Sequence, residues 1–335
     1  MDWTKGFTAQ YIVTTVDPHT WGDTGEIDIT SGTIDRDAET DLIESAEVTV
    51  RERIAEQWVR IYLIAKQSGA DTVREALFTG IATTPKRSIF GEREENSLEC
   101  YSVLKVADDI LLPLGYFAGA GVRGGEIVRR LLSDLPCPVT ITERSPYLLN
   151  NIVAGQNDSK LKMARQIVDA MNWQIRITGS GEVFVEPKPS TIAASFDSQN
   201  ADVIEPQVTD DQDLFGIPNA LRVTMSERTA TVRDDNPESE WGTVKRGREI
   251  WKAESVSGLT DNETLGAYTM RRLKELQSPA RTLTYSRRFD PNVVPGSLVN
   301  IVYPRQDISG TFRVKNQRIE LSFNARTEEE AVNES

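Results

Sequence analysis

Few residues in this sequence can supply nucleophilic or metal-binding chemistry. Its 335 residues include one histidine, His19, and two cysteines, Cys100 and Cys137. A zinc site usually takes three or four Cys or His ligands, and a Ser–His or Cys–His catalytic pair needs a histidine, so we expect neither. His19 follows Asp17 and Pro18 and is expected in a surface turn. The cysteines belong to no motif, and we expect two free thiols in a reducing compartment.

Long apolar runs and an excess of positive charge are also lacking. The longest apolar stretches, such as residues 110–114, fall far short of the about 20 residues that span a bilayer. The first ten residues contain no basic segment followed by an apolar run, so no secretory signal peptide is expected. With 51 acidic and 38 basic residues the net charge is −13, which argues against wrapping nucleic acid. The length predicts two to four globular domains.

Residues 1–112 have the pattern of a β domain. The segment from Trp58 to Ile64 is apolar on both faces, which predicts a central strand covered from two sides. Gly- and Ser-containing turns separate the runs, as in a sandwich or small barrel. The expected strands are residues 25–29, 46–50, 57–65, 76–81 and 97–106.

Residues 120–187 have the pattern of a small α+β domain. One amphipathic helix is predicted from Ile127 to Leu135, where Pro136 ends it. A second is predicted from Leu161, with Asp158 or Ser159 as its N-cap. A short strand is expected at 139–142, and segments 174–178 and 182–186 flank Gly-Ser-Gly as a hairpin.

Residues 191–279 form a mixed region, and residues 280–325 return to β structure. Strands 220–225 and 229–233 are expected to pair, and capping-box residues Thr260 and Glu263 predict a helix over 260–277, stopped by Ser278 and Pro279. The last three strands are expected at 281–286, 297–303 and 310–323. The last one changes its buried parity, which predicts a bulge near 315–317. The charged tail, residues 326–335, is expected to fray.

Residues 119–124 match the dinucleotide pattern GxGxxG, with Glu143 after a strand 24 residues beyond the first glycine. The preceding segment contains Pro113 and Gly115 and makes a poor buried parallel strand. No series of βαβ units follows. We therefore interpret residues 119–125 as a hinge that introduces a helix after a domain boundary.

Charge clusters carry no recognisable ligand pattern. Residues 35–39, 108–109 and 210–213 are acidic but lack the spacing of a twelve-residue calcium loop, so solvated turns are expected. The basic spots 245–248 and 287–288 are too short for a nucleic-acid patch, and a salt-bridged subunit contact is at least as plausible. We expect no catalytic, cofactor-binding or metal-binding residue.

The order of elements resembles that of phage tail hub proteins. Residues 25–29 and 40–50 look like their opening strands, and residues 97–112 resemble the strand that closes their first barrel. Residues 289–299, followed by 310–314, resemble the end of the second barrel, with Ser297 where an aspartate is common. The family includes baseplate hubs, tail-tip hubs and the base of type VI secretion spikes.

This resemblance implies a mixed β and α+β fold with two hub-type β-barrels, the second built from residues 215–256 and 280–325. It implies a virion protein, assembled in the host cytoplasm as a homotrimer that adapts a sixfold tail tube to a threefold tip. Its partners would be the tube, distal tail or baseplate, tape-measure and tip or spike proteins. DNA would pass without specific binding, and the acidic loops 35–39, 210–213 and 234–240 are the candidates for facing that channel. A carboxylate-dependent cell-wall hydrolase and a nucleotide-binding α/β protein are the alternatives.

Overall fold

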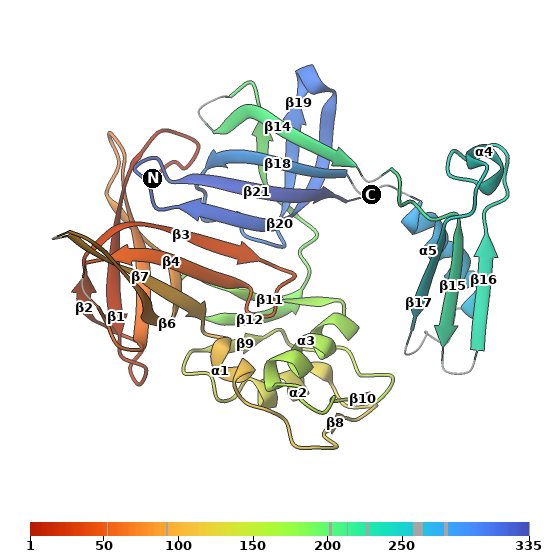
Figure 1. Cartoon of the computed structure of the whole chain (residues 1–335), viewed down its shortest axis with the longest axis horizontal. Helices are drawn as coiled ribbons and strands as arrows, with labels where there is room; N and C mark the ends of the chain where they lie inside the picture. Colours follow the sequence, from red (N-terminus) through yellow and green to blue (C-terminus); the bar gives the residue numbers. More distant parts are fainter. Residues whose placement is uncertain are drawn as a thin grey trace. The chain divides into compact units, whose positions relative to one another are not determined.

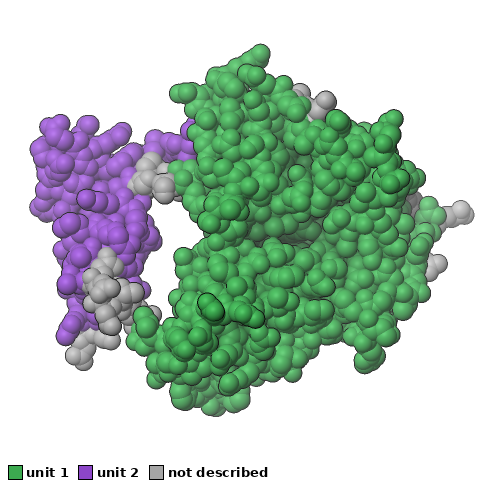
Figure 2. Space-filling view, turned by 180° about the vertical axis from the view of Figure 1, so that it is seen from behind, with its two compact units in different colours: residues 1–209, 283–334 green, residues 210–282, 335 purple. Residues whose placement is uncertain are grey.

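A computed structural model describes residues 1–51, 53–91, 93–200, 203–212, 214–225, 228–256, 264–277 and 281–334 (Figure 1). The chain separates into two compact units, coloured in Figure 2. Unit 1 comprises residues 1–209 and 283–334, and unit 2 comprises residues 210–282. The finer division into barrels and an inserted domain stays a prediction.

The N-terminal part of unit 1 is a run of antiparallel strands in the order β3-β4-β7-β6-β5-β1-β2. Their side chains alternate between core and solvent, as in β4, where Ala46 and Val48 are buried and Glu47 is exposed. β1 was not expected, and β6 is three times as long as predicted. The bounds are β1 (Thr8–Val16), β2 (Asp23–Ile27), β3 (Ile29–Asp37), β4 (Glu44–Val50), β5 (Gln57–Lys66), β6 (Val73–Phe90) and β7 (Arg93–Ser102).

The C-terminal strands continue the same sheet, because β20 (Ile308–Glu320) pairs with β3 as well as with β19 and β21. The order β14-β18-β21-β20-β3 joins the two halves, and β13 runs parallel to β19. The sheet has 13 strands, and the described residues contain no closed barrel. The other bounds are β13 (Ile192–Asp197), β14 (Ile204–Gln212), β18 (Arg281–Arg288), β19 (Leu298–Tyr303), η1 (Pro304–Gln306) and β21 (Arg326–Asn333).

Two expectations about the chain end have opposite outcomes. The bulge is confirmed, because the β20–β21 register shifts between Val314 and Asn316 and both Phe312 and Ile319 are buried. The frayed tail is wrong: residues 326–333 form β21, because pairing with β20 buries Thr327, Glu329 and Ala331.

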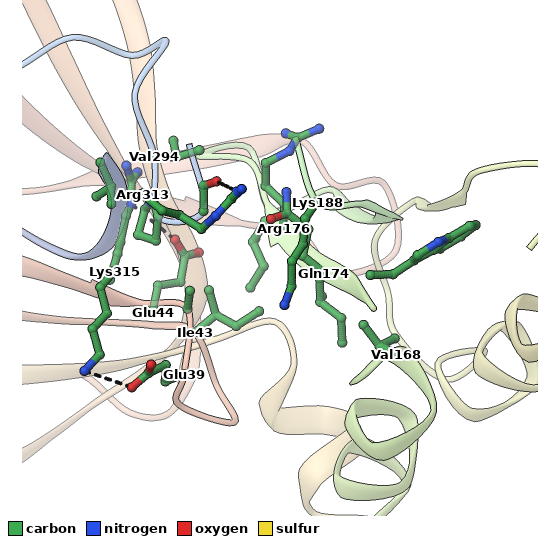
Figure 3. Close-up of a pocket in the computed structure, with 18 of the residues that line it drawn as sticks. Glu39, Ile43, Glu44, Val168, Gln174, Arg176, Lys188, Val294, Arg313 and Lys315 are labelled. Atoms are coloured by element: carbon green, nitrogen blue, oxygen red, sulfur yellow. Dashed lines mark hydrogen bonds and ion pairs between the residues drawn. The ribbon is translucent and has the colours of Figure 1, made fainter. Parts of the chain in front are cut away.

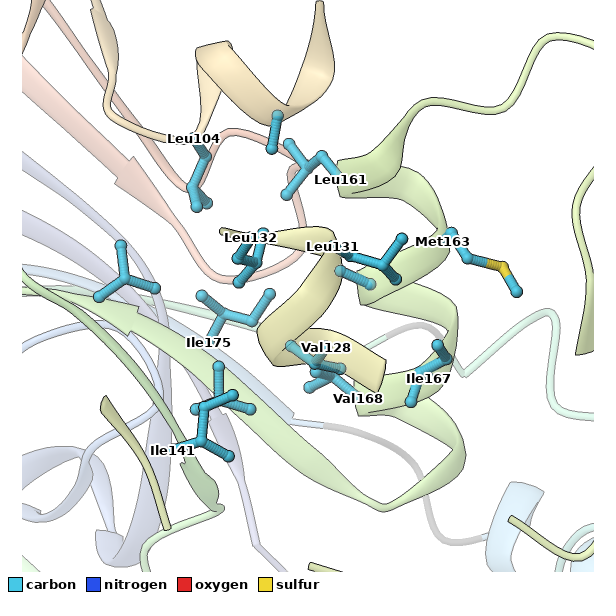
Figure 4. Close-up of a cluster of buried hydrophobic side chains, with 14 of the residues drawn as sticks. Leu104, Val128, Leu131, Leu132, Ile141, Leu161, Met163, Ile167, Val168 and Ile175 are labelled. Carbon is cyan, nitrogen blue, oxygen red and sulfur yellow. The ribbon is translucent and has the colours of Figure 1, made fainter. Parts of the chain in front are cut away.

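The α+β part of unit 1 has its own core. α2 (Gly124–Leu131) and α3 (Lys160–Ala170) pack together over a three-stranded sheet, so that Val128, Leu131, Ile167 and Ile175 meet between helices and strands (Figure 4). The predicted cap is confirmed, since Ser159 Oγ accepts the Lys162 N–H at 3.1 Å. The strand expected to reach residue 106 ends at 102. The remaining bounds are α1 (Lys105–Asp108), β8 (Phe117–Ala118), β9 (Val139–Ile141), β10 (Ile152–Val153), β11 (Trp173–Ile177) and β12 (Val183–Pro187).

Unit 2 is a three-stranded sheet with one long helix. β15 (Ala220–Met225) pairs with β16 (Arg228–Arg233), as predicted, and also runs parallel to β17 (Trp251–Ser255). α5 (Leu265–Leu276) buries Leu273 against β15, and the short α4 (Thr243–Arg246) precedes β17. The predicted capping residues Thr260 and Glu263, and the stop at 278–279, lie outside the described residues.

Candidate functional site

A cavity of about 500 Å³ opens in unit 1, in the size range of ligand pockets (Figure 3). Its wall combines the β3–β4 connection, α3, β11 and parts of β20 and β21. The walls are mixed, with apolar side chains such as Val168, Trp173 and Val294 between charged ones. None of the described residues that line it is Ser, Thr, Cys, His or Tyr. The cavity therefore offers no hydroxyl, thiol or imidazole for covalent catalysis.

A buried ion pair lies in the cavity wall. Arg36 Nε is 3.5 Å from Glu44 Oε2, and both side chains are almost completely buried. Arg36 Nη1 donates to Gln317 Oε1 at 2.9 Å, whereas Arg36 Nε and Glu44 Oε1 have no hydrogen-bond partner among the described residues. Burial raises the pKa of Glu44 to about 8, although the Arg36 charge opposes that shift. Burial therefore favours the neutral form of Glu44, against the attraction of the Arg36 charge.

A second buried pair lies behind the first, and Gln317 connects them. Arg287 donates to both oxygens of Glu329, at 2.8 and 2.6 Å, and neither side chain is exposed to solvent. Tyr285 OH and Gln317 Nε2 donate to the same carboxylate, at 2.8 and 2.7 Å. Residues 287–288 form a basic spot for which the sequence makes a subunit contact at least as plausible as a nucleic-acid patch. Arg287 is instead bonded inside its own chain, because its position on β18 faces the core. The alternation of Tyr285, Arg287 and Phe289 was the available signal.

Ion pairs neutralise most of the charge around the cavity mouth. They are Arg165–Asp41 (3.7 Å), Arg176–Glu186 (2.8 Å), Arg313–Glu334 (2.5 Å) and Lys315–Glu39 (3.1 Å). Lys188 also lines the cavity and has no ion-pair partner among the described residues. Glu39 and Asp41 are thus engaged with cations, and Asp169 is the remaining exposed carboxylate among the described residues that line the cavity.

The GxGxxG segment does not form a phosphate cradle. Its backbone N–H groups already donate within the chain: Gly121 to the Leu148 carbonyl at 2.8 Å and Gly124 to that of Pro146 at 2.9 Å. The preceding β8 has two residues and pairs antiparallel with β10, so there is no parallel strand before the helix. The segment also lies within unit 1 and is not a boundary between the two compact units.

The scarce residues behave as expected. His19 is exposed in a turn, and its backbone N–H donates to Asp17 Oδ1 at 2.9 Å. Cys100 and Cys137 are buried free thiols, and burial raises the pKa of Cys137 to about 12.

In the described ranges no group of three His, Cys, Asp or Glu side chains could hold a metal ion. No helix among these residues is long and apolar enough to cross a membrane.

The acidic segments are largely paired with cations. Asp35 lies in β3, 3.4 Å from Arg318, and Asp210 lies in β14, 2.7 Å from Arg281. Two of the expected solvated turns are therefore strand ends, in which cross-strand arginines offset the carboxylates. In 234–240, Asp235 is 2.9 Å from Arg233. Asp213 lies outside the described residues.

No protein-family model and no curated protein sequence matches the chain. Solved structures do match its fold. A tail protein from Neisseria meningitidis MC58 covers 97% of this chain and 97% of its own, with a TM-score of 0.72 and 14% identity. The 43 kDa tail protein of prophage MuSo2 from Shewanella oneidensis covers 96% and 97%, with a TM-score of 0.67 and 11% identity. A chain of the Francisella PdpA–VgrG complex covers 98% of this chain and 58% of its own, with a TM-score of 0.56 and 8% identity.

These matches extend over nearly the whole chain, at identities that establish the fold alone. The fold of the matched tail proteins agrees with the resemblance to phage tail hub proteins that the order of elements in the sequence indicates. The chain has the mostly antiparallel, β-rich fold of these solved tail proteins.

Proposed function

We propose that this chain is a structural tail hub of a tailed phage or phage-like particle. The observation that carries the proposal is the end-to-end match to a tail protein, which covers 97% of each chain. A shared fold does not by itself define a function. However, such a match leaves no large part of either chain to carry an unrelated activity.

In this proposal three copies form a ring. Each chain contributes two hub-type barrels, so that three chains present six similar surfaces to the tail tube and threefold symmetry to the tip. Outer strands such as β2 and β14 have one pairing edge open in the isolated chain, and neighbouring subunits would cover such edges. The ring leaves a channel through which DNA passes without specific binding. The tube, distal tail or baseplate, tape-measure and tip or spike proteins are its partners.

The proposed role is not enzymatic. A cell-wall hydrolase needs two accessible carboxylates at a fixed separation. Among the described residues that line the cavity, Glu39 and Asp41 are ion-paired and Glu44 is buried, which leaves Asp169 alone. A nucleotide-binding protein needs free backbone N–H groups in its Gly-rich loop, and those of Gly121 and Gly124 are occupied. No observation favours either alternative.

Native mass spectrometry and negative-stain electron microscopy of the purified protein test the proposal. We expect a trimer with a central opening, and we expect peptidoglycan to stay intact after incubation with it. A strictly monomeric protein at high concentration, with no association with tube or tip proteins, contradicts the proposal. Cleavage of peptidoglycan that a single Asp→Asn or Glu→Gln change abolishes does so as well.

A further inference from the structure

Unit 2 carries an exposed group of aromatic and cationic side chains, the Arg/aromatic surface, formed by Phe215, Arg222, Arg248 and Trp251. The Arg248 guanidinium lies 4.8 Å from the centre of the Phe215 ring, and that of Arg222 lies 5.6 Å from the Trp251 ring. Phe215 is 79% exposed and Trp251 is 47% exposed. Exposed aromatics with arginines over them are the composition of energetic centres in protein interfaces.

Backbone contacts hold these side chains in one place. β17, which carries Trp251, runs parallel to β15, which carries Arg222. Asn219 Nδ2 donates to the Arg248 carbonyl at 2.9 Å. In α4, Arg246 Nη2 donates at 2.8 Å to the carbonyl of the residue before Phe215. The segments that carry the two aromatic–arginine pairs are therefore held next to each other in unit 2.

The cations of this patch have no carboxylate partners. Arg222 and Arg248 form no ion pair with any carboxylate in the described part of the chain. The nearby Glu249, which accepts a hydrogen bond from Trp251 Nε1 at 2.8 Å, is itself paired with Arg233. A patch of unneutralised cations favours an acidic partner. A second copy of this chain, with a net charge of −13, has that character.

Unit 1 has a matching acidic face. Glu47 on β4 and Glu99 on β7 are direct cross-strand partners, and neither forms an ion pair with a described cation. Glu320 continues the row, because Thr33 lies between it and Glu47 in the sheet, but its carboxylate is 3.9 Å from Arg326, so Glu47 and Glu99 are the acids that remain for a partner. Like charges directly opposite each other destabilise a sheet, so the pair costs stability that a cationic partner recovers. We call Glu47, Glu99 and Glu320 the acidic row.

We propose that the Arg/aromatic surface of one copy docks onto the acidic row of the next copy in the ring. This inference rests on the proposed trimer. A cyclic ring of identical chains needs a heterologous contact between two different surfaces of each copy, and this chain supplies both. DNA is the other ligand that such a surface suits, but the net charge of the chain opposes its binding.

Charge reversal tests the contact. Sedimentation velocity and native mass spectrometry compare the wild type with the double variant Arg222→Glu/Arg248→Glu and with Glu47→Arg/Glu99→Arg. We expect each double variant to raise the dissociation constant of the trimer by about 100-fold. The four substitutions together reverse both surfaces and restore the trimer. Lys274→Glu, an exposed cation on α5, is the control and leaves the trimer intact. Circular dichroism checks that every variant is folded.

The outcomes separate this inference from the proposed function. A monomeric wild type overturns both. A trimeric wild type whose Arg222→Glu/Arg248→Glu variant stays trimeric overturns the docking surface and leaves the hub intact. If either double variant dissociates and the combined variant does not reassociate, the proposed pairing is wrong. Fluorescence anisotropy with a labelled DNA duplex gives the last check, because tight binding that the arginine variant abolishes assigns the surface to nucleic acid.

Discussion

The buried pair of Arg287 and Glu329 gives the sharpest prediction about the fold. The Glu329 carboxylate accepts two hydrogen bonds from Arg287 and one each from Tyr285 and Gln317, and both charged side chains are fully buried. Glu329→Gln keeps the volume and leaves the Arg287 charge uncompensated in the core. Breaking a buried ion pair in this way costs about 3–5 kcal/mol, so we expect a loss of that size in the free energy of unfolding.

The matched control is an exposed pair between two strands of the same sheet, β3 and β20. Asp35 and Arg318 lie 3.4 Å apart with side chains 48% and 55% exposed, and exposed pairs contribute about 0–1 kcal/mol. We therefore expect Asp35→Asn to change stability little. Because the cost arises from the orphaned charge, the double variant Arg287→Met/Glu329→Gln should be more stable than Glu329→Gln alone.

Urea unfolding followed by circular dichroism measures the free energies, and hydrogen exchange of residues 308–333 reports on unit 1 specifically. If Glu329→Gln destabilises the protein no more than Asp35→Asn does, the reasoning from buried charge is refuted. The same holds if the double variant is less stable than the single one.

Three further predictions concern other buried groups. The folded-state pKa of Glu44, about 8, exceeds its ordinary value of 4.5, so the folded protein holds a proton that the unfolded chain has lost. The free energy of unfolding of the wild type, relative to that of Glu44→Gln, should therefore fall as pH rises from about 4.5 to 8. A difference between the two proteins that stays constant over this range in urea titrations contradicts this. A Cβ at Gly125 would meet a serine oxygen at 2.7 Å, so Gly125→Ala should lower the free energy of unfolding by about 1–3 kcal/mol, measured by thermal unfolding. Gly119→Ala is the control: a Cβ there would meet no atom nearer than 3.8 Å, so this change should have little effect. Cys100 and Cys137 should resist a thiol reagent until denaturant is added, because burial raises the pKa of both thiols; rapid labelling of the folded protein would argue against it.

Elements with a strong local pattern could be predicted from the sequence. α3 has both a regular apolar face and a Ser159 cap, and the β11–β12 hairpin has its Gly-Ser-Gly turn. β1 was missed because Ala9, Val13, Thr14 and Val16 bury both parities of the strand, so no alternation is visible. β6 was predicted too short because its second half is polar in sequence yet pairs with β7.

The cavity and its ion pairs could not be predicted, because their residues come from distant parts of the chain. Arg36 and Gln317 are 281 positions apart and become cross-strand partners through the pairing of β3 with β20. β21 was expected to fray since its three consecutive glutamates suggest a solvated segment. A charged residue at a core parity, as with Glu329 between Thr327 and Ala331, depends on a partner that no local pattern reveals.

The register of β20 connects these observations. β20 pairs with β3 from the first part of the chain and with β21 from the last, so its register determines how the two halves of the sheet meet. A slip of one residue would turn Gln317 and Ile319 toward the opposite face and leave Arg36 and Glu329 without their shared partner. Apolar side chains tolerate approximate neighbours, whereas buried charges do not. The linked ion pairs therefore penalise every register but one, and the cost of burying them serves to join the halves of the sheet in a single way.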